Sequence, residues 1–132
     1  MTCYTLNPGT YAIGDPAIFV KKTKEGDAWL TLLWATFYKD MNSFQHLDLN
    51  GVSFYITRTA EGDYYYRGIG TDTGTLMVIK IDGFNDERFR FTKEQHGVKY
   101  FDTEVDVSVC VDRFNLHFSN GIDVITNSDD MI

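Results

Sequence analysis

The sequence contains few prolines and no long hydrophobic run. Only two of its 132 residues are proline, and proline is the residue that removes a backbone donor from a β-ladder. No apolar run approaches the roughly 20 residues that a membrane-spanning helix needs. The first residues also lack the basic-then-apolar pattern of a secretory signal. We therefore expect no membrane partner.

Cysteine is equally scarce. Cys3 and Cys110 are the only two, and they lie near opposite ends of the chain. Two widely separated cysteines form neither a disulfide-rich framework nor the spacing of a zinc knuckle. We therefore expect both thiols to be free and the protein to be cytoplasmic, because a reducing compartment keeps thiols unpaired.

Positive charge is in the minority. The chain has 12 Lys and Arg residues against 19 Asp and Glu residues, a formal net charge of −7. Such a chain repels phosphate backbones at long range, which argues against direct nucleic-acid binding. The charge is compatible with a basic protein partner, with a cation or with solubility alone.

Aromatic residues, by contrast, are abundant. The eight Tyr and ten Phe residues favour the pleated surface of a sheet. The length suits one globular domain, 1–132. We expect a mainly β (α+β) fold: a single curved antiparallel sheet or a small sandwich, with one helix packed against it.

The segment Gly62–Asp82 is the part around which this fold is organised. It combines a short strand at Tyr64–Tyr66, a glycine-rich loop and an apolar strand at Leu76–Ile81. Because the apolar strand has large side chains on both faces, we expect it to be central and covered on both sides. Val52–Ile56 alternates apolar and polar residues, and we expect it to form a hairpin with Tyr64–Tyr66.

Val105–Val111 carries the clearest two-residue period in the chain. We expect it to reverse at Asp112–Asn115 into a strand that buries Leu116 and Phe118. Short strands are also expected at Ala17–Val20, Arg88–Phe91 and Val98–Phe101, and a polar loop before the Asn50-Gly51 turn.

Asp27–Met41 is the one strong helix candidate, with Asp27 as its N-cap. Its apolar residues form two stripes, one made of Trp29, Leu32, Leu33 and Phe37 and the other of Leu30, Trp34, Tyr38 and Met41. We favour a helix that lies across a sheet and is partly covered by neighbouring loops. The alternative is that one of the two stripes is the interface of a homodimer.

Three aspartates in turn-like segments, Asp15, Asp63 and Asp72, are candidates for a cation site. Flexible Asp and Gly loops supply the oxygen ligands that Ca²⁺ takes. Asp beside Gly is also the ordinary composition of a turn, and we favour that interpretation.

The expected register of the Val105–Val111 hairpin places Cys110 opposite His117. Side chains at such positions are about 5 Å apart, which suits a thiolate and an imidazole. No third, orienting residue is recognisable, so we favour an incidental pair. His46 and His96 lie in loop-like stretches without zinc-ligand spacing.

An acidic row is expected on one strand face, formed by Asp102, Glu104, Asp106 and Asp112. Outward charges are the normal solvent face of a sheet and protect an edge strand from aggregation. The same row is the basis of a minority hypothesis, an acidic DNA mimic.

Several short motifs occur in a fixed order: Tyr11-Ala12-Ile13-Gly14-Asp15-Pro16, then Gly62-Asp63-Tyr64-Tyr65, then Asp72-Thr73-Gly74. In this order they resemble a group of small bacteriophage and bacterial proteins. The likeness covers roughly Thr10 to Thr126. It implies a similar fold and a phage-type origin, and the group has no assigned activity. Tyr64 and Arg67 depart from the group's pattern, so the resemblance implies no shared loop ligand.

No phosphate-binding loop, nucleophile elbow or zinc-protease motif is present in the sequence. We therefore expect no enzyme activity, no cofactor and no metal. The expected function is a non-enzymatic, phage-type accessory protein that binds and inhibits a host or antiviral-defence protein. Its contact surface is expected on the tyrosine strand and glycine loop, at Tyr64, Tyr65, Tyr66, Arg67, Asp72 and Thr73.

Other functions stay open beside this one. The aromatic residues and the glycine loop are the expected walls of a pocket for a small nucleotide-like molecule, with Arg67 or Arg58 reaching its phosphates. A DNA mimic based on the acidic row is a second alternative, and an enzyme that uses Cys110 and His117 is a third.

Overall fold

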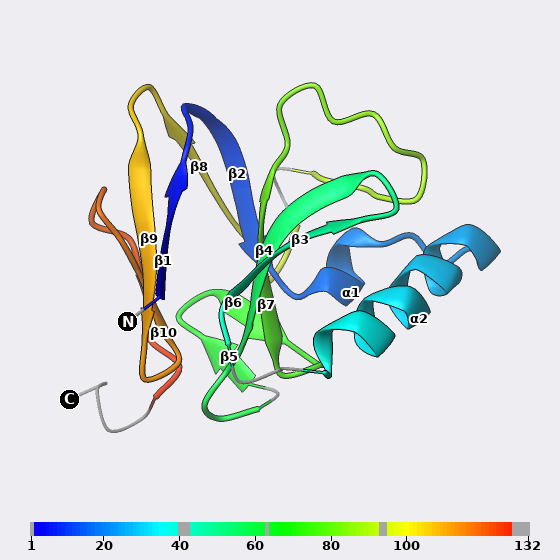
Figure 1. Ribbon diagram of the computed structural model, residues 1–132, viewed down its shortest axis with the longest axis horizontal. Helices are drawn as coiled ribbons and strands as arrows, with labels where there is room; N and C mark the ends of the chain where they lie inside the picture. The colour runs from blue at the N-terminus through cyan, green and yellow to red at the C-terminus, as the bar shows by residue number, and fades with distance from the viewer. Residues whose placement is uncertain (1, 40–42, 63, 93–94, 128–132) are drawn as a thin grey trace.

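The chain folds into three layers, and the computed structural model describes residues 2–39, 43–62, 64–92 and 95–127 of it. A five-stranded sheet forms the middle layer. Two helices cover one of its faces and a four-stranded sheet covers the other (Figure 1). The expectation of a mainly β fold with a packed helix is confirmed, and the sheets form a sandwich.

Every described strand pairs antiparallel with its neighbours. The middle sheet contains, in spatial order, β3 (Gln45–Leu49), β4 (Val52–Arg58), β7 (Thr75–Lys80), β2 (Gly9–Gly14) and β8 (Lys99–Thr103). The outer sheet contains, in spatial order, β1 (Thr2–Leu6), β9 (Val107–Asp112), β10 (Asn115–Phe118) and β11 (Asp123–Val124). A separate hairpin is formed by β5 (Tyr64–Tyr66) and β6 (Ile69–Thr71), and the helices are α1 (Pro16–Phe19) and α2 (Lys24–Phe37).

Strand β7 lies at the centre of the middle sheet, as its apolar pattern predicts. Met77 and Ile79 pack into the core under the helices, whereas Leu76 and Val78 pack into the core between the two sheets. All four side chains are at most 1% exposed. Because one strand contributes to both cores, the expectation of a central strand covered on both sides is confirmed.

Helix α2 begins earlier than predicted. Its N-cap is Thr23, whose hydroxyl oxygen accepts a hydrogen bond from the Gly26 N–H at 3.0 Å, and Asp27 lies in the first turn instead. Gly26 is required there because a Cβ at this position would lie 2.1 Å from the Lys21 carbonyl oxygen. The helix ends at Phe37, and the predicted end at Met41 lies outside the described residues.

The first apolar stripe of α2 faces the middle sheet. Trp29, Leu33 and Phe37 are buried there, but Leu32 is 41% exposed and does not belong to the stripe. In the second stripe, Leu30 and Trp34 pack against the edge of the same core and Tyr38 is 49% exposed. The described part of the second stripe is therefore partly covered by this core. Neither α1 nor α2, the helices of the described chain, is both long and apolar enough to span a bilayer.

The segment Ala17–Val20 is not the strand that we expected. Pro16 to Phe19 form the short helix α1, with Asp15 as N-cap. A proline at the first helical position has the right φ and no N–H to lose. The rule that disfavours helix for the residue before a proline is still obeyed, because Asp15 itself has extended angles.

Three strand expectations need correction. Tyr64–Tyr66 pairs with β6 and not with Val52–Ile56, because β4 already has β3 and β7 as its neighbours. Gln45–Leu49 is a strand where a loop was expected. Arg88–Phe91 contributes only an isolated bridge between Val20 and Phe89, whereas the expected strand at Val98–Phe101 corresponds to β8.

The β9–β10 hairpin has the register that its valine alternation predicts. Val111 lies opposite Leu116, and Cys110 lies opposite His117. Leu116 and Phe118 are buried between the sheets with Val107 and Val109. Val105, which was expected in the strand, precedes β9 and is 66% exposed.

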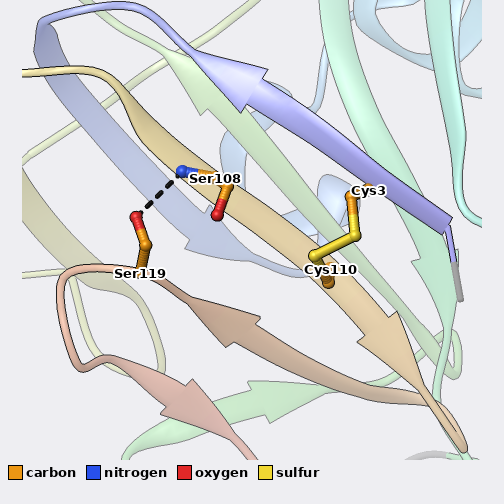
Figure 2. Close-up of a disulfide and its surroundings, with 4 residues drawn as sticks. All are labelled: Cys3, Ser108, Cys110 and Ser119. Atoms are coloured by element: carbon orange, nitrogen blue, oxygen red, sulfur yellow. Dashed lines mark hydrogen bonds between the residues drawn. A yellow bond between two sulfur atoms is a disulfide. The ribbon is translucent and has the colours of Figure 1, made fainter.

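Figure 2 shows a disulfide between Cys3 of β1 and Cys110 of β9. The two residues lie directly opposite each other in the β1–β9 ladder. The expectation of free thiols is therefore wrong, because no local pattern reveals that β1 pairs with a strand so far along the sequence. The expected cytoplasmic location was based on free thiols and loses that support.

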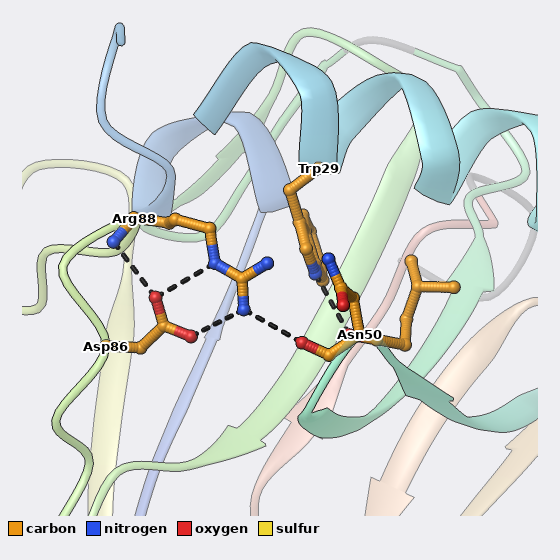
Figure 3. Close-up of polar contacts among 5 residues, drawn as sticks. Trp29, Asn50, Asp86 and Arg88 are labelled. Atoms are coloured by element: carbon orange, nitrogen blue, oxygen red, sulfur yellow. Dashed lines mark hydrogen bonds and ion pairs between the residues drawn. The ribbon is translucent and has the colours of Figure 1, made fainter. Parts of the chain in front are cut away.

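A polar cluster connects the helix layer to the loops beside it (Figure 3). The Trp29 indole N–H donates to the Leu49 carbonyl at 3.1 Å, and Arg88 Nη2 donates to the neighbouring Asn50 carbonyl at 2.9 Å. Arg88 also donates from Nε and Nη2 to the Asp86 carboxylate at 3.0 and 2.6 Å. These side-chain hydrogen bonds from Arg88 hold the pKa of Asp86 below its ordinary value.

We predict that Asp86→Asn lowers the free energy of unfolding by about 1–2 kcal/mol at pH 7, because Arg88 loses a charged acceptor. Since the pKa of Asp86 is lower in the folded state than in the unfolded state, its stabilisation is complete above the unfolded value of about 4 and disappears as pH falls through the folded value. The difference between wild type and variant should therefore shrink below pH 4.

Urea denaturation of both proteins between pH 2.5 and pH 7 measures this difference. Glu87→Gln is the matched control, since Glu87 is the exposed neighbouring carboxylate. An Asp86→Asn penalty that stays constant down to pH 2.5 would contradict the assignment.

Candidate binding surface beside the short helix

The carboxylate of Asp15 is fully buried, with 0% of the residue exposed. Its Oδ1 accepts a hydrogen bond from the Ala17 N–H at 2.8 Å and so caps α1. Its Oδ2 accepts from the Asp72 and Thr73 N–H groups at 2.7 and 2.9 Å. The hydroxyls of Thr71 and Thr73 lie 2.9 and 3.0 Å from the same oxygen. A buried carboxylate without a cation is tolerated only when donors surround it in this way.

Asp15 therefore joins two segments that lie far apart in the sequence. One is the end of β2 and the start of α1, and the other is the loop from β6 to β7. These two segments contain the Gly14-Asp15-Pro16 and Asp72-Thr73-Gly74 motifs. The motifs meet in space at one carboxylate.

This geometry does not suit the cation site considered for Asp15. A cation needs acceptors around it, whereas the Asp15 carboxylate is surrounded by donors. Asp72 is exposed, and Asp63 lies outside the described residues. In the described part of the chain, no group of three or more His, Cys, Asp or Glu side chains is arranged to hold a metal ion.

A hollow of about 520 Å³ lies beside α1 and the anchored loop. Its apolar lining comes from α1 and the residue after it, and its charged lining consists of three cations and one acid. The lining residues are Ala17, Ile18, Val20, Lys21, Lys22, Arg90 and Asp72. Three cations around one hollow are a local reversal of charge in a chain of net charge −7.

Backbone pairing brings the cations of the hollow together. The Arg90 N–H donates to the Phe19 carbonyl at 2.7 Å, and the Lys21 N–H donates to the Arg88 carbonyl at 2.8 Å. These bonds flank the bridge between Val20 and Phe89. The segments after α1 and before residue 91 therefore run side by side, which sets Arg90 beside the two lysines.

The residues predicted to form the contact surface on the tyrosine strand and glycine loop do not all lie at the surface. Tyr66 is 2% exposed and its hydroxyl donates to the Gly62 carbonyl at 3.1 Å, so it belongs to the interior. The side chains of Tyr64 and Tyr65 lie outside what the structure describes. Arg67 is exposed in the turn between β5 and β6, with φ of 49°.

Of the predicted site residues whose side chains the structure describes, only Asp72 lines the hollow. Thr73 is half-buried and uses its N–H and hydroxyl to hold the loop to Asp15. Sequence reasoning missed the three cations of the hollow because Arg90 was assigned to the expected strand Arg88–Phe91, whereas Lys21 and Lys22 were expected in solvent after Ala17–Val20. Nothing in the sequence indicates that these two segments lie side by side. The one feature of the sequence that could have indicated this site is the cluster of three lysines in residues 21–24 of a chain that is otherwise acidic.

The expected acidic row is not a single strand face. Asp102 lies in β8 of the middle sheet, whereas Asp112 ends β9 of the outer sheet. Glu104 and Asp106 lie in the connection between them. The four side chains are exposed but do not continue one another along a strand, so the geometry expected for a DNA mimic is absent from these residues.

The Cys110–His117 pair has a third member that the sequence does not reveal. His117 Nδ1 lies 2.8 Å from Asp123 Oδ1, in the next strand of the outer sheet. His46 lies in β3, where a loop was expected, with its Nε2 3.4 Å from the Ser53 hydroxyl.

No family model, curated protein or solved structure matches the chain.

We predict that Asp15→Asn lowers the free energy of unfolding by at least about 2 kcal/mol, because a neutral amide brings an N–H₂ group among donors that need an acceptor. Thermal and urea denaturation measure the loss. Asp72→Asn is the matched control, since its exposed side chain is not the group that holds the loop. Equal stability of the two variants would contradict the role of Asp15.

Proposed function

We propose that the protein is a non-enzymatic binding protein whose contact surface is the cationic hollow beside α1. The observation that carries this proposal is the set of Lys21, Lys22 and Arg90 around one hollow of about 520 Å³. The complementary partner presents a carboxylate or phosphate group between apolar contacts. We propose this surface in place of the contact surface expected on the tyrosine strand and glycine loop. Of the residues expected there, Asp72 also lines the hollow.

Charge distribution supports the choice of partner. The whole chain carries −7, so most of its surface repels anions, and a local cluster of cations selects where an anionic group docks. Arg90 adds the planar, multi-donor guanidinium that binds carboxylates and phosphates in pairs of hydrogen bonds.

The fixed position of the segments that line the hollow also supports the proposed binding surface. The loop at 72–74 is fixed by its hydrogen bonds to Asp15, and α1 is fixed by the same carboxylate. A surface that is already ordered loses less conformational entropy on binding. The buried aspartate therefore acts on binding indirectly, by holding two walls of the hollow in place.

The resemblance to small bacteriophage and bacterial proteins supports the biological setting. We propose a phage-type accessory protein that works in the host bacterial cytoplasm and inhibits a host or antiviral-defence protein. Two of the three motifs that carry the resemblance, Gly14-Asp15-Pro16 and Asp72-Thr73-Gly74, meet at Asp15. These motifs therefore hold the loop at 72–74 to the start of α1. The neighbouring cations Lys21, Lys22 and Arg90 are the residues that select the partner.

A second candidate ligand is a small nucleotide-like molecule. The volume of the hollow is within the range of about 300–1,000 Å³ that is usual for small-molecule sites. Arg90 is then the phosphate contact. Arg58 lies with its guanidinium carbon 4.8 Å from the centre of the Phe114 ring, in a cation–π contact away from this hollow.

The test is affinity capture from a bacterial host lysate with mass spectrometry of the captured proteins. We predict that Lys22→Glu/Arg90→Glu loses the partner that the wild type captures, because the cations of the hollow become acids. Lys24→Glu/Lys39→Glu is the matched control, with the same change of net charge on exposed lysines outside the hollow. Equal capture by both double variants would refute the assigned surface.

Thermal denaturation with a nucleotide panel separates the second candidate from the first. A nucleotide at millimolar concentration should raise the melting temperature of the wild type and not of Lys22→Glu/Arg90→Glu if the hollow is a nucleotide site. No shift with any nucleotide, together with capture of a protein, assigns the hollow to a protein partner.

A further inference from the structure

Four side chains form a row across the outer sheet, one from each strand. Cys3 lies opposite Cys110, Cys110 lies opposite His117, and His117 lies opposite Asp123. Directly opposed residues of antiparallel strands project from the same face. The neighbours Val109 and Leu116 point into the core between the sheets, so the row lies on the outer face.

The row is accessible to solvent. Cys3 is exposed and Cys110 is half-buried. The side chains of His117 and Asp123 are 42% and 54% exposed. An exposed disulfide beside an imidazole and a carboxylate differs from a structural disulfide sealed in a core, which small thiols do not reach.

We propose that the Cys3–Cys110 disulfide is a thiol-exchange site for low-molecular-weight thiols of the glutathione class. The thiolate of the small molecule attacks Sγ of Cys3. A new sulfur–sulfur bond forms between Cys3 and the small molecule, the Cys3–Cys110 bond breaks, and Cys110 leaves as a thiolate. No net oxidation or reduction occurs in this step, because one disulfide and one thiolate are exchanged for another pair.

Exposure and leaving-group stability both select Cys3 as the attacked atom. Cys3 belongs to β1 at the edge of the sheet, whereas Cys110 lies between β1 and β10. Attack on Cys3 expels the sulfur of Cys110, the residue that lies opposite His117 in the β9–β10 ladder. Thiol exchange is faster when the departing thiolate is stabilised, and an adjacent imidazolium provides that stabilisation.

Asp123 prepares His117 for this role. The 2.8 Å contact between Asp123 Oδ1 and His117 Nδ1 orients the ring and favours the tautomer that has its hydrogen on Nδ1. His117 and Asp123 are thus positioning residues for the Cys110 sulfur. Their arrangement follows that of an activated thiol, in which the sulfur lies next to an imidazole and the imidazole is oriented by a third group.

The mixed disulfide resolves in one of two ways. The Cys110 thiolate attacks Sγ of Cys3 and expels the small thiolate, which restores the original bond. Alternatively, a second small thiolate attacks the sulfur of the bound small molecule. The products are then a small-molecule disulfide and two protein thiols, and the small thiols have supplied two electrons to the cysteines.

The fold does not depend on this bond alone. Strand β1 stays in the sheet through five paired positions with β9. Leu6 is 1% exposed in the core, and the Tyr4 hydroxyl donates to the Phe44 carbonyl at 3.1 Å. Exchange at Cys3 therefore modifies the protein without releasing the strand.

The test incubates the oxidised, folded protein with reduced glutathione at pH 7.5, stops the reaction with N-ethylmaleimide, and maps the peptides by mass spectrometry. We expect glutathione on the Cys3 peptide and N-ethylmaleimide on the Cys110 peptide. His117→Asn should slow the appearance of this product about tenfold or more, and Asp123→Asn several-fold. His46→Asn, at the exposed histidine of β3, should leave the rate unchanged.

A second variant keeps the test independent of the stability of the disulfide. Cys3→Ser leaves Cys110 as a thiol opposite His117, and iodoacetamide should alkylate it faster at pH 7.5 than in Cys3→Ser/His117→Asn. Glutathione on Cys110 in place of Cys3, or equal rates with and without His117 in both assays, would overturn the proposal.

Discussion

The burial of the Asp15 carboxylate is the constraint on which the described arrangement depends most. Moving an ionised carboxylate out of water is costly, and here the cost is offset by backbone N–H groups and threonine hydroxyls. Those donors are supplied only when the loop at 72–74 closes over the start of α1. A four-residue helix is too short to be stable by itself, so α1 exists because Asp15 caps it and the core buries Phe19.

The alternation of apolar and polar residues within one strand was enough to predict which of its side chains are buried. The two apolar faces of β7 and the valine alternation of β9 predict burial on both sides and the hairpin register, since a shift by one residue would expose every core side chain. The start of α2 was predicted wrongly at Asp27, because Asp27 and Thr23 are both residue types that favour the N-cap position. The structure decides between them, because the Gly26 N–H donates to the Thr23 hydroxyl oxygen.

Pairings between distant segments could not be predicted, and the candidate site depends on them. Alternation shows which face of a strand is buried and not which strand lies next to it. The Cys3–Cys110 bond, the bridge between Val20 and Phe89 and the donors around Asp15 all join segments far apart in sequence. Tyr66 shows the complementary error, because an aromatic side chain favours an interface and a core equally well.

The two proposed sites are physically independent. The cationic hollow belongs to the helix layer, and the row from Cys3 to Asp123 lies on the far side of the outer sheet, so the middle sheet separates them (Figure 1). Strand β7 contributes buried side chains to both cores, and no described side chain belongs to both sites. Thiol exchange at Cys3 should therefore leave binding at Arg90 unchanged, and the two activities are separable by substitution.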